Sequence, residues 1–247
     1  MTFTVITPYV FEDEINNLKK YAPWQLEWIF ERDDSHIGPD MMYQKLWKQC
    51  DTDIFIFHAD MEPFPGQEEW WKRLDYYVNR FPKTGIFGCK LLYPARDENE
   101  NYYIECAGGK FENGKPDHFG SGIDIENKVA FKTPEPDTGQ YDHVREVAWN
   151  TFGGIYIRRQ VLDEIGDFDP QYEWSYNRDV DYCLRTREKG WKIYQIPIPL
   201  LHYQSKDVKR IKTDENVKAE QRNLNRLHSQ WGHSSLYQTI NNIIEES

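Results

Sequence analysis

A short acidic stretch follows an apolar run near the front of the chain. Residues 53–57 (Asp-Ile-Phe-Ile-Phe) are apolar enough for a strand buried on both faces, and residues 58–62 (His-Ala-Asp-Met-Glu) follow directly. A carboxylate at the C-terminal end of such a strand projects into the crevice where layered α/β proteins bind ligands. Hard divalent cations take oxygen ligands of this kind and bridge to substrate phosphates. Asp60 is therefore a candidate metal ligand, with a turn or helix-capping role as the alternative.

A second acidic cluster opens a predicted helix. The run 178–181 reads Arg-Asp-Val-Asp. The helix dipole favours an ionised carboxylate at this place, and such a carboxylate within hydrogen-bond reach of a hydroxyl can act as a general base. Asp179 is the candidate base, with helix capping as the alternative. For Asp181 the alternative to a ligand contact is an ion pair with Arg178 or Arg185.

A histidine and a basic cluster follow later in the chain. His202 comes after a proline-containing segment and is either a surface residue or a metal ligand. Neutral imidazole binds transition-metal dications, so His202 would suit manganese better than magnesium. The basic cluster could cover a pyrophosphate or form a solvated face. It consists of Lys206, Lys209, Arg210 and Lys212.

Alternating strands and helices must position these residues. Strands are predicted over 3–7, 25–31 and 53–57, with helices over 12–21 and 39–50. This spacing is typical of a layered α/β domain with parallel strands, in which ligands bind beyond the carboxyl ends of the strands. The groups expected to converge there are residues 7–9, 33–35 and 58–60.

The second half of the chain continues the pattern after an interruption. Residues 93–144 are rich in Gly, Asn, Pro and Asp and predict a long irregular insertion with a small antiparallel sheet. Two separate extended pieces are predicted over 192–196 and 200–204. The chain beyond residue 205 is polar and predicts further helices.

Composition disfavours several classes of protein. A net charge of −11 argues against nucleic acid as the main partner, because phosphate neutralisation needs clustered Lys and Arg. No window approaches the roughly 20 apolar residues of a membrane span. The four cysteines form no C-x-x-C pair, so buried reduced thiols are expected. The N-terminus reads as a first strand and not as a signal peptide, and we expect a cytoplasmic protein.

The order of short blocks between residues 153 and 202 carries a family resemblance. The blocks are Gly-Gly-Ile-Tyr-Ile-Arg-Arg at 153–159, Ile-Gly-Asp-Phe-Asp at 165–169, Asp-Val-Asp-Tyr-Cys-Leu-Arg at 179–185, Glu-Lys-Gly-Trp at 188–191, Pro197 and His202, with Gln-Trp at 230–231 near the C-terminus. With its blocks in this order, the chain resembles a family 2 glycosyltransferase of the inverting, rhamnosyltransferase-like kind, over roughly residues 3–231.

The resemblance implies the α/β GT-A fold, a Rossmann-like three-layer domain. Its central sheet is mostly parallel, with a small antiparallel acceptor-side sheet and C-terminal helices. Residues 1–205 would form the GT-A domain, with 1–92 as the nucleotide-binding half and 93–205 as the acceptor and catalytic half. Residues 206–247 would form a C-terminal loop and helical extension.

The resemblance also implies an activity: metal-dependent, inverting transfer of a sugar from a nucleoside-diphosphate sugar to an acceptor hydroxyl. The acceptor would be a glycan, a lipid-linked glycan or a glycoprotein. Asp179 would be the catalytic base, and Asp60, His202 and Glu62 would bind the metal, with Mn²⁺ favoured and Mg²⁺ possible. The residues implied to bind the donor are Thr7, Pro8, Tyr9, Glu31, Asp33, Gly38, His58, Ala59, Gly153, Gly154, Lys206 and Arg210. Those expected to contact the acceptor are Trp149, Trp174 and Asp181.

Two departures from the family pattern keep alternatives open. His58 occupies the first acidic position of the metal-binding motif, and Arg178 replaces the usual Glu before the base. A catalytically degenerate domain that binds a nucleotide or glycan is one alternative. A nucleotidyltransferase is another, disfavoured because residues 8–12 (Pro-Tyr-Val-Phe-Glu) hold neither glycine nor cation where such enzymes carry a Gly-rich, basic loop.

Overall fold

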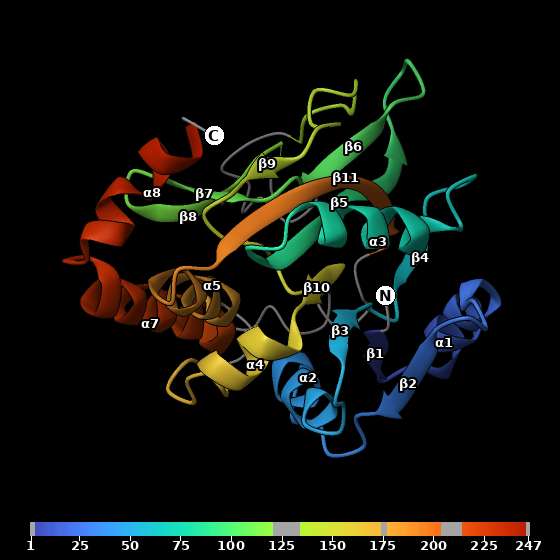
Figure 1. Ribbon diagram of the computed structural model, residues 1–247, viewed down its shortest axis with the longest axis horizontal. Helices are drawn as coiled ribbons and strands as arrows, with labels where there is room; N and C mark the ends of the chain where they lie inside the picture. Colours follow the sequence, from blue (N-terminus) through green and yellow to red (C-terminus); the bar gives the residue numbers. More distant parts are fainter. Residues whose placement is uncertain (1–2, 121–133, 174–176, 204–213, 246–247) are drawn as a thin grey trace.

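The computed structural model describes residues 3–120, 134–173, 177–203 and 214–245. Among these residues, nine strands form one central sheet with helices packed against it (Figure 1). The sheet order is β2-β1-β3-β10-β5-β11-β4, with β6 beside β5 and β9 beside β11. The strands of this sheet are β1 (Phe3–Tyr9), β2 (Glu27–Arg32), β3 (Asp53–Ile56), β4 (Met61–Pro63), β5 (Thr84–Arg96), β6 (Tyr102–Cys106), β9 (Arg145–Glu146), β10 (Ile155–Ile157) and β11 (Lys192–His202).

Strand direction brings the ends of distant strands to one edge. β1 pairs in parallel with β2 and β3, and β5 pairs in parallel with β11. The short β10 lies between these groups and runs antiparallel to both β3 and β5. The strands β1, β2, β3, β5 and β11 therefore all point the same way, as the prediction of a mostly parallel sheet requires. Their C-terminal ends share the edge where ligands bind in such sheets.

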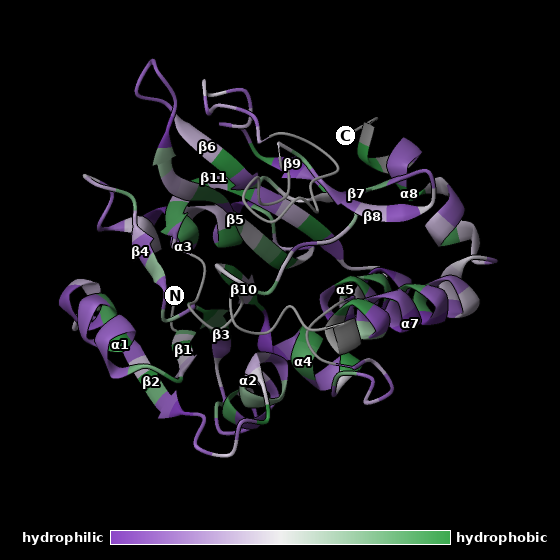
Figure 2. Ribbon diagram, turned by 180° about the vertical axis from the view of Figure 1, so that it is seen from behind, coloured by the Kyte–Doolittle hydropathy of each residue, from purple (hydrophilic) through white to green (hydrophobic). Residues whose placement is uncertain are grey.

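Helices cover both faces because the central strands are apolar on both sides. On β3, the side chains of Ile54 and Ile56 belong to one core cluster and that of Phe55 to the other. Figure 1 shows α2, α4, α5 and α7 along one face, whereas α1 and α3 contribute to the opposite core. Figure 2 shows that α1 and α7 carry both hydrophilic and hydrophobic residues along their lengths. The helices are α1 (Glu12–Leu18), the 3₁₀ turn η1 (Lys19–Tyr21), α2 (Pro39–Trp47), α3 (Trp70–Arg80), α4 (Arg159–Ile165), α5 (Arg178–Glu188), α7 (Asp214–Trp231) and α8 (Ser235–Glu245).

The strand β11 corrects the prediction of two separate extended pieces. It runs without interruption from Lys192 to His202, and its pairing with β5 shifts register between Ile196 and Pro199. Prolines lack the N–H that a ladder needs, and a register shift lets a strand pass through them. The single long strand places His202 at the ligand-binding edge of the sheet.

The insertion after β5 contains the small antiparallel sheet that the sequence predicts. Strands β7 (Gly109–Glu112) and β8 (Lys115–His118) form a hairpin whose turn residues, Asn113 and Gly114, both have positive φ. Asn-Gly favours this type of two-residue turn.

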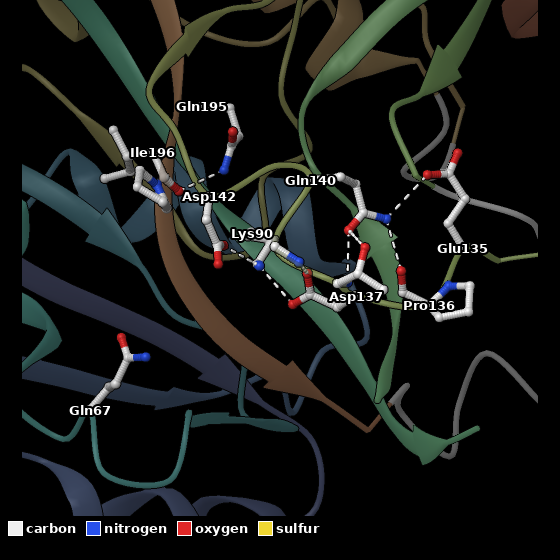
Figure 3. A network of polar contacts seen from close by, with 12 residues as sticks. Gln67, Lys90, Glu135, Pro136, Asp137, Gln140, Asp142, Gln195 and Ile196 are labelled. Carbon is white, nitrogen blue, oxygen red and sulfur yellow. Dashed lines mark hydrogen bonds and ion pairs between the residues drawn. The ribbon is translucent and has the colours of Figure 1, made fainter. Parts of the chain in front are cut away.

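A buried lysine fastens the segment 134–142 to the sheet. Lys90 of β5 has a side chain 2% exposed and lies between Asp137, at 2.6 Å, and Asp142 (Figure 3). Gln140 adds hydrogen bonds to the carbonyl of Pro136 and the carboxylate of Glu135. The ammonium group therefore holds this segment against the centre of the sheet.

The four cysteines are buried and unpaired, which confirms the prediction of reduced thiols. Within the described ranges, no helix combines the length and apolar character needed to cross a bilayer.

Candidate metal and active site

Three side chains from two distant segments form a compact cluster. His58 and Asp60 lie between β3 and β4, and His202 ends β11, where it pairs with Met61 of β4. One ligand atom from each lies within 4.8 Å of the others. The Asp60 side chain is 8% exposed, and its Oδ2 atom lies 3.3 Å from Nε2 of His202 without accepting a hydrogen bond from any described residue. A buried carboxylate oxygen with free acceptor capacity beside two imidazoles fits a divalent metal ion.

The charges of the cluster are coupled. Burial lowers the pKa of His58 to about 4, so this ring is neutral at physiological pH. Burial opposes ionisation of Asp60, but the neighbouring His202 outweighs it and lowers the pKa of the carboxyl to about 2. Burial likewise opposes the charge on His202, yet Glu105 and Asp60 raise its pKa well above the ordinary value. In the metal-free protein His202 therefore holds a proton, which a metal ion at Nε2 would displace.

Each histidine has an outer partner that sequence reasoning missed. The hydroxyl of Tyr43, on α2, lies 2.5 Å from Nε2 of His58. The carboxylate of Glu105, on β6, lies 2.7 Å from Nδ1 of His202. Neither residue belongs to a local motif, so no signal in the sequence pointed to them.

Asp179 lies in the first turn of α5, as the sequence predicts. Asn177, two residues before Asp179, has a left-handed φ of 65° and turns the chain into the helix. The carboxylate accepts a hydrogen bond of 2.9 Å from the Val180 N–H and stays partly exposed. Burial of the Asp179 side chain raises the pKa of its carboxyl to about 7. Its charge also contributes to the raised pKa of Tyr43.

The unusual Arg178 has a buried acidic partner. Its Nη1 atom lies 3.7 Å from Oδ2 of Asp40, and its Nε atom donates to the carbonyl of Tyr172 at 3.0 Å. Burial and the nearby Asp179 raise the pKa of Asp40 well above its usual value, against the influence of Arg178. The Arg178 cation is thus matched by an acid supplied from α2.

Residues predicted to bind the nucleotide meet at the expected edge of the sheet. Pro8 of β1 pairs with Glu31 of β2, and the N–H of Asp33 donates to the carbonyl of Tyr9 at 2.8 Å. The Asp33 carboxylate accepts the N–H groups of Ile37 and Gly38 at 3.0 and 2.9 Å, which shapes the loop before α2.

Other predicted donor residues differ in their surroundings. Thr7 is fully buried, and its hydroxyl has no hydrogen-bond partner among the described residues. Ala59 is buried between the two metal-ligand candidates, and Glu31 pairs with Lys45. Gly154 has a φ of 64°.

Gly153 packs against the metal cluster itself. A Cβ atom at this position would lie 2.7 Å from Cε of Met61 and 2.9 Å from Cε1 of His58. The absence of a side chain therefore lets the His58 ring occupy its place.

The structure does not support three of the predicted contacts. Asp181 is fully buried and accepts hydrogen bonds from Arg185, Gln230 and Trp231, so it fastens α7 to α5 and is not available to an acceptor. Trp149 is 4% exposed, with its ring covering Gly109.

The third contact is that of Glu62 with the metal. Its carboxylate lies outside the cluster and accepts hydrogen bonds from Asn17 and, at 3.2 Å, from the hydroxyl of Tyr203. His58 takes the expected place of a second ligand from this segment. The predicted sites Trp174, Lys206 and Arg210 lie outside the described residues.

A cavity of 230 Å³ opens next to Asp60. Its lining comes from α1, from the segment that follows β3 and from the residue after β11: Asp13, Glu14, Asn17, Ala59, Asp60, Met61, Glu62 and Tyr203. The cavity gives Asp60, one of the three candidate metal ligands, access to solvent.

Comparisons with known proteins find likeness in structure alone. No protein-family model and no curated sequence matches this chain. Among solved structures, GalNAc-T7 with UDP, GalNAc and Mn²⁺ matches with a TM-score of 0.64 and 11% identity, over 96% of this chain and 49% of that one. The chain has the GT-A fold.

A second solved protein supports the same fold. Residues 1–349 of TarS from S. aureus, in complex with UDP-GlcNAc, match with a TM-score of 0.50 and 12% identity, over 96% of this chain and 75% of that one. Both matches are glycosyltransferases of the GT-A fold. The chain spans about half the length of GalNAc-T7 and three quarters of the TarS fragment, and identities this low show the fold alone.

Proposed function

We propose that this chain is a metal-dependent glycosyltransferase that moves a sugar from a nucleoside-diphosphate sugar to an acceptor hydroxyl. The observation that carries the proposal is the partly buried cluster of His58, Asp60 and His202 at the C-terminal edge of the parallel strands of a GT-A sheet. GalNAc-T7 and TarS were solved with UDP and with UDP-GlcNAc, so UDP sugars are the first donors to test.

The cluster would hold the ion through two imidazole nitrogens and one carboxylate. Nitrogen ligands favour Mn²⁺ over Mg²⁺, which prefers oxygen ligands and retains its water. When bound, the ion would neutralise negative charge on the departing nucleoside diphosphate.

Asp179 would act as the general base. It would take the proton of the acceptor hydroxyl while the acceptor oxygen bonds to the anomeric carbon of the donor sugar. The bond from that carbon to the diphosphate oxygen breaks, and attack from the opposite face inverts the configuration. A carboxyl with a pKa of about 7 holds the proton strongly enough to assist this transfer and is substantially ionised near neutral pH.

The other predicted contacts complete the proposal. Thr7, Pro8, Tyr9 and Asp33 would line the nucleotide side, and Lys206 with Arg210 would approach the pyrophosphate. The acceptor would be a glycan, a lipid-linked glycan or a glycoprotein, reached from the half of the domain that follows residue 92. A cytoplasmic location stays a prediction.

A thermal-shift screen tests this function. UDP, UDP-GlcNAc and UDP-GalNAc are added with and without Mn²⁺ to the full chain and to Asp60→Ala. A ligand that binds the native state raises Tm with its occupancy, so we expect a shift that needs both metal and nucleotide and is absent in the variant. No shift with any nucleoside diphosphate or its sugars would overturn the proposal. Release of UDP from the donor in the absence of an acceptor would then indicate an enzyme, whereas a domain that only binds the nucleotide sugar would release none.

A further inference from the structure

In each histidine of the cluster, one ring nitrogen faces Asp60 and the other faces a partner outside the cluster. His58 directs Nδ1 toward Asp60, at 4.0 Å from Oδ1, and Nε2 toward the hydroxyl of Tyr43. His202 directs Nε2 toward Asp60 and Nδ1 toward the carboxylate of Glu105. The inner nitrogens face the common space between the three ligands, whereas each outer nitrogen has a protein partner.

The two outer partners are held firmly in place. Tyr43 is 3% exposed, and its ring is nearly parallel to that of His58, at an angle of 13°. The Glu105 side chain is 18% exposed and comes from β6, which pairs with β5. The outer partners therefore belong to α2 and β6, separate from the segments that carry the ligands.

A neutral imidazole has one protonated nitrogen and one lone pair. If the outer nitrogen carries the proton and donates it to a fixed oxygen, the lone pair must point inward. The oxygen of Tyr43 can accept from Nε2–H of His58, and the carboxylate of Glu105 can accept from Nδ1–H of His202. The two negative charges of Asp60 and Glu105 would also balance the two positive charges of a divalent ion.

We propose that Glu105 and Tyr43 are positioning residues, which present Nε2 of His202 and Nδ1 of His58 to the metal ion. This inference rests on the proposed metal site. The two histidines thus bind the ion through different nitrogens, each fixed by a different outer partner. Outer partners of this kind commonly contribute tenfold to a hundredfold to metal affinity.

The test measures Mn²⁺ affinity of the full chain without nucleotide, from the EPR signal of free Mn²⁺. We expect Glu105→Ala and Tyr43→Phe each to raise the Kd by about tenfold to a hundredfold. Glu105→Gln should recover part of the loss, because its amide oxygen still accepts from Nδ1–H. Matched controls are Glu100→Ala and Tyr76→Phe, at exposed positions, which should leave the Kd unchanged.

The Zn²⁺ complex of the ¹⁵N-histidine-labelled chain supplies a second readout. We expect His202 with Nδ1 protonated and Nε2 bound to the metal, and His58 with the reverse assignment. Observation of the opposite nitrogens in the wild-type chain would overturn the proposal even if a variant failed to fold.

Asp60→Ala separates this inference from the proposed function. If Asp60→Ala abolishes Mn²⁺ binding while Glu105→Ala and Tyr43→Phe bind as the wild type does, the positioning roles are wrong and the metal site stands. If Asp60→Ala binds Mn²⁺ normally, the metal site itself is wrong.

Discussion

Asp179 would carry the proton transfer of the proposed reaction, and its surroundings set the pH at which it can do so. Burial raises the pKa of this carboxyl to about 7, although the helix N-terminus and the Val180 N–H favour the ionised form. Desolvation therefore outweighs the local hydrogen bonds. The result is a carboxylate far more basic than an exposed Asp.

The first prediction concerns the pH dependence of turnover. The ionised carboxylate is the active form, so kcat/KM for sugar transfer should rise with pH through about 7 and then level off. Asp179→Asn should lower kcat by a factor of about 10² to 10⁴. The measurement is UDP release with Mn²⁺ and a UDP sugar over a pH series. The control Asp163→Asn, at an exposed position on α4, should behave as the wild type. Full turnover in Asp179→Asn would exclude Asp179 as the base.

The second prediction concerns stability and follows from the same raised pKa. Between the usual carboxyl pKa and about 7, the folded state binds the Asp179 proton more tightly than the unfolded chain does. The free energy of unfolding that this group contributes therefore falls as pH rises through that window. Asp179→Asn removes the buried charge, so its Tm relative to the wild type should be higher at pH 8 than at pH 4. A difference in Tm independent of pH would contradict the raised pKa.

At the scale of elements, helix α5 separates two acids that lie only two residues apart. Positions i and i+2 point to different sides of a helix. Asp181 accordingly faces α7 and accepts a hydrogen bond from the indole N–H of Trp231 at 2.9 Å, whereas Asp179 stays partly exposed. The helix thus links the candidate base to the C-terminal helices, whose apolar residues join the same core.

The third prediction tests this linkage. Asp181→Ala should lower the free energy of unfolding by ~3 kcal/mol, because it leaves a buried Trp N–H and a partly buried Arg185 without their acceptor. Asp181→Asn, which keeps one oxygen, should cost less. Chemical denaturation measures the loss, and Mn²⁺ affinity should stay unchanged in both variants. A Mn²⁺ affinity that falls together with stability would show that Asp181 also shapes the site.

At the scale of the whole molecule, the site forms where two groups of strands meet. His58 and Asp60 follow β3 of the first group, and His202 ends β11 of the second. Lys90, on β5 of the second group, holds the segment 134–142 through two carboxylates. The second group of strands therefore supplies both a candidate metal ligand and the anchor for segment 134–142.

The fourth prediction concerns this anchor. Lys90→Met should lower the free energy of unfolding by ~3 kcal/mol, because it leaves the Asp137 carboxylate largely buried without a cation. The double variant Lys90→Met/Asp137→Asn should recover part of the loss. The control Lys83→Met, at an exposed position, should have little effect. Equal stability of Lys90→Met and wild type in urea denaturation would show that the ion pairs do not hold the segment.

The sequence by itself determined the layered α/β pattern, because hydrophobic periodicity and turn residues are local. It placed Asp60 after a buried strand and Asp179 at a helix start. Only the tertiary structure decided that Asp181 and Trp149 are buried, because the burial of a side chain depends on which distant elements pack against it. The pairing of Glu105 with His202 joins residues 97 positions apart. Such a contact depends on strand order and on the register shift in β11, which no local pattern specifies.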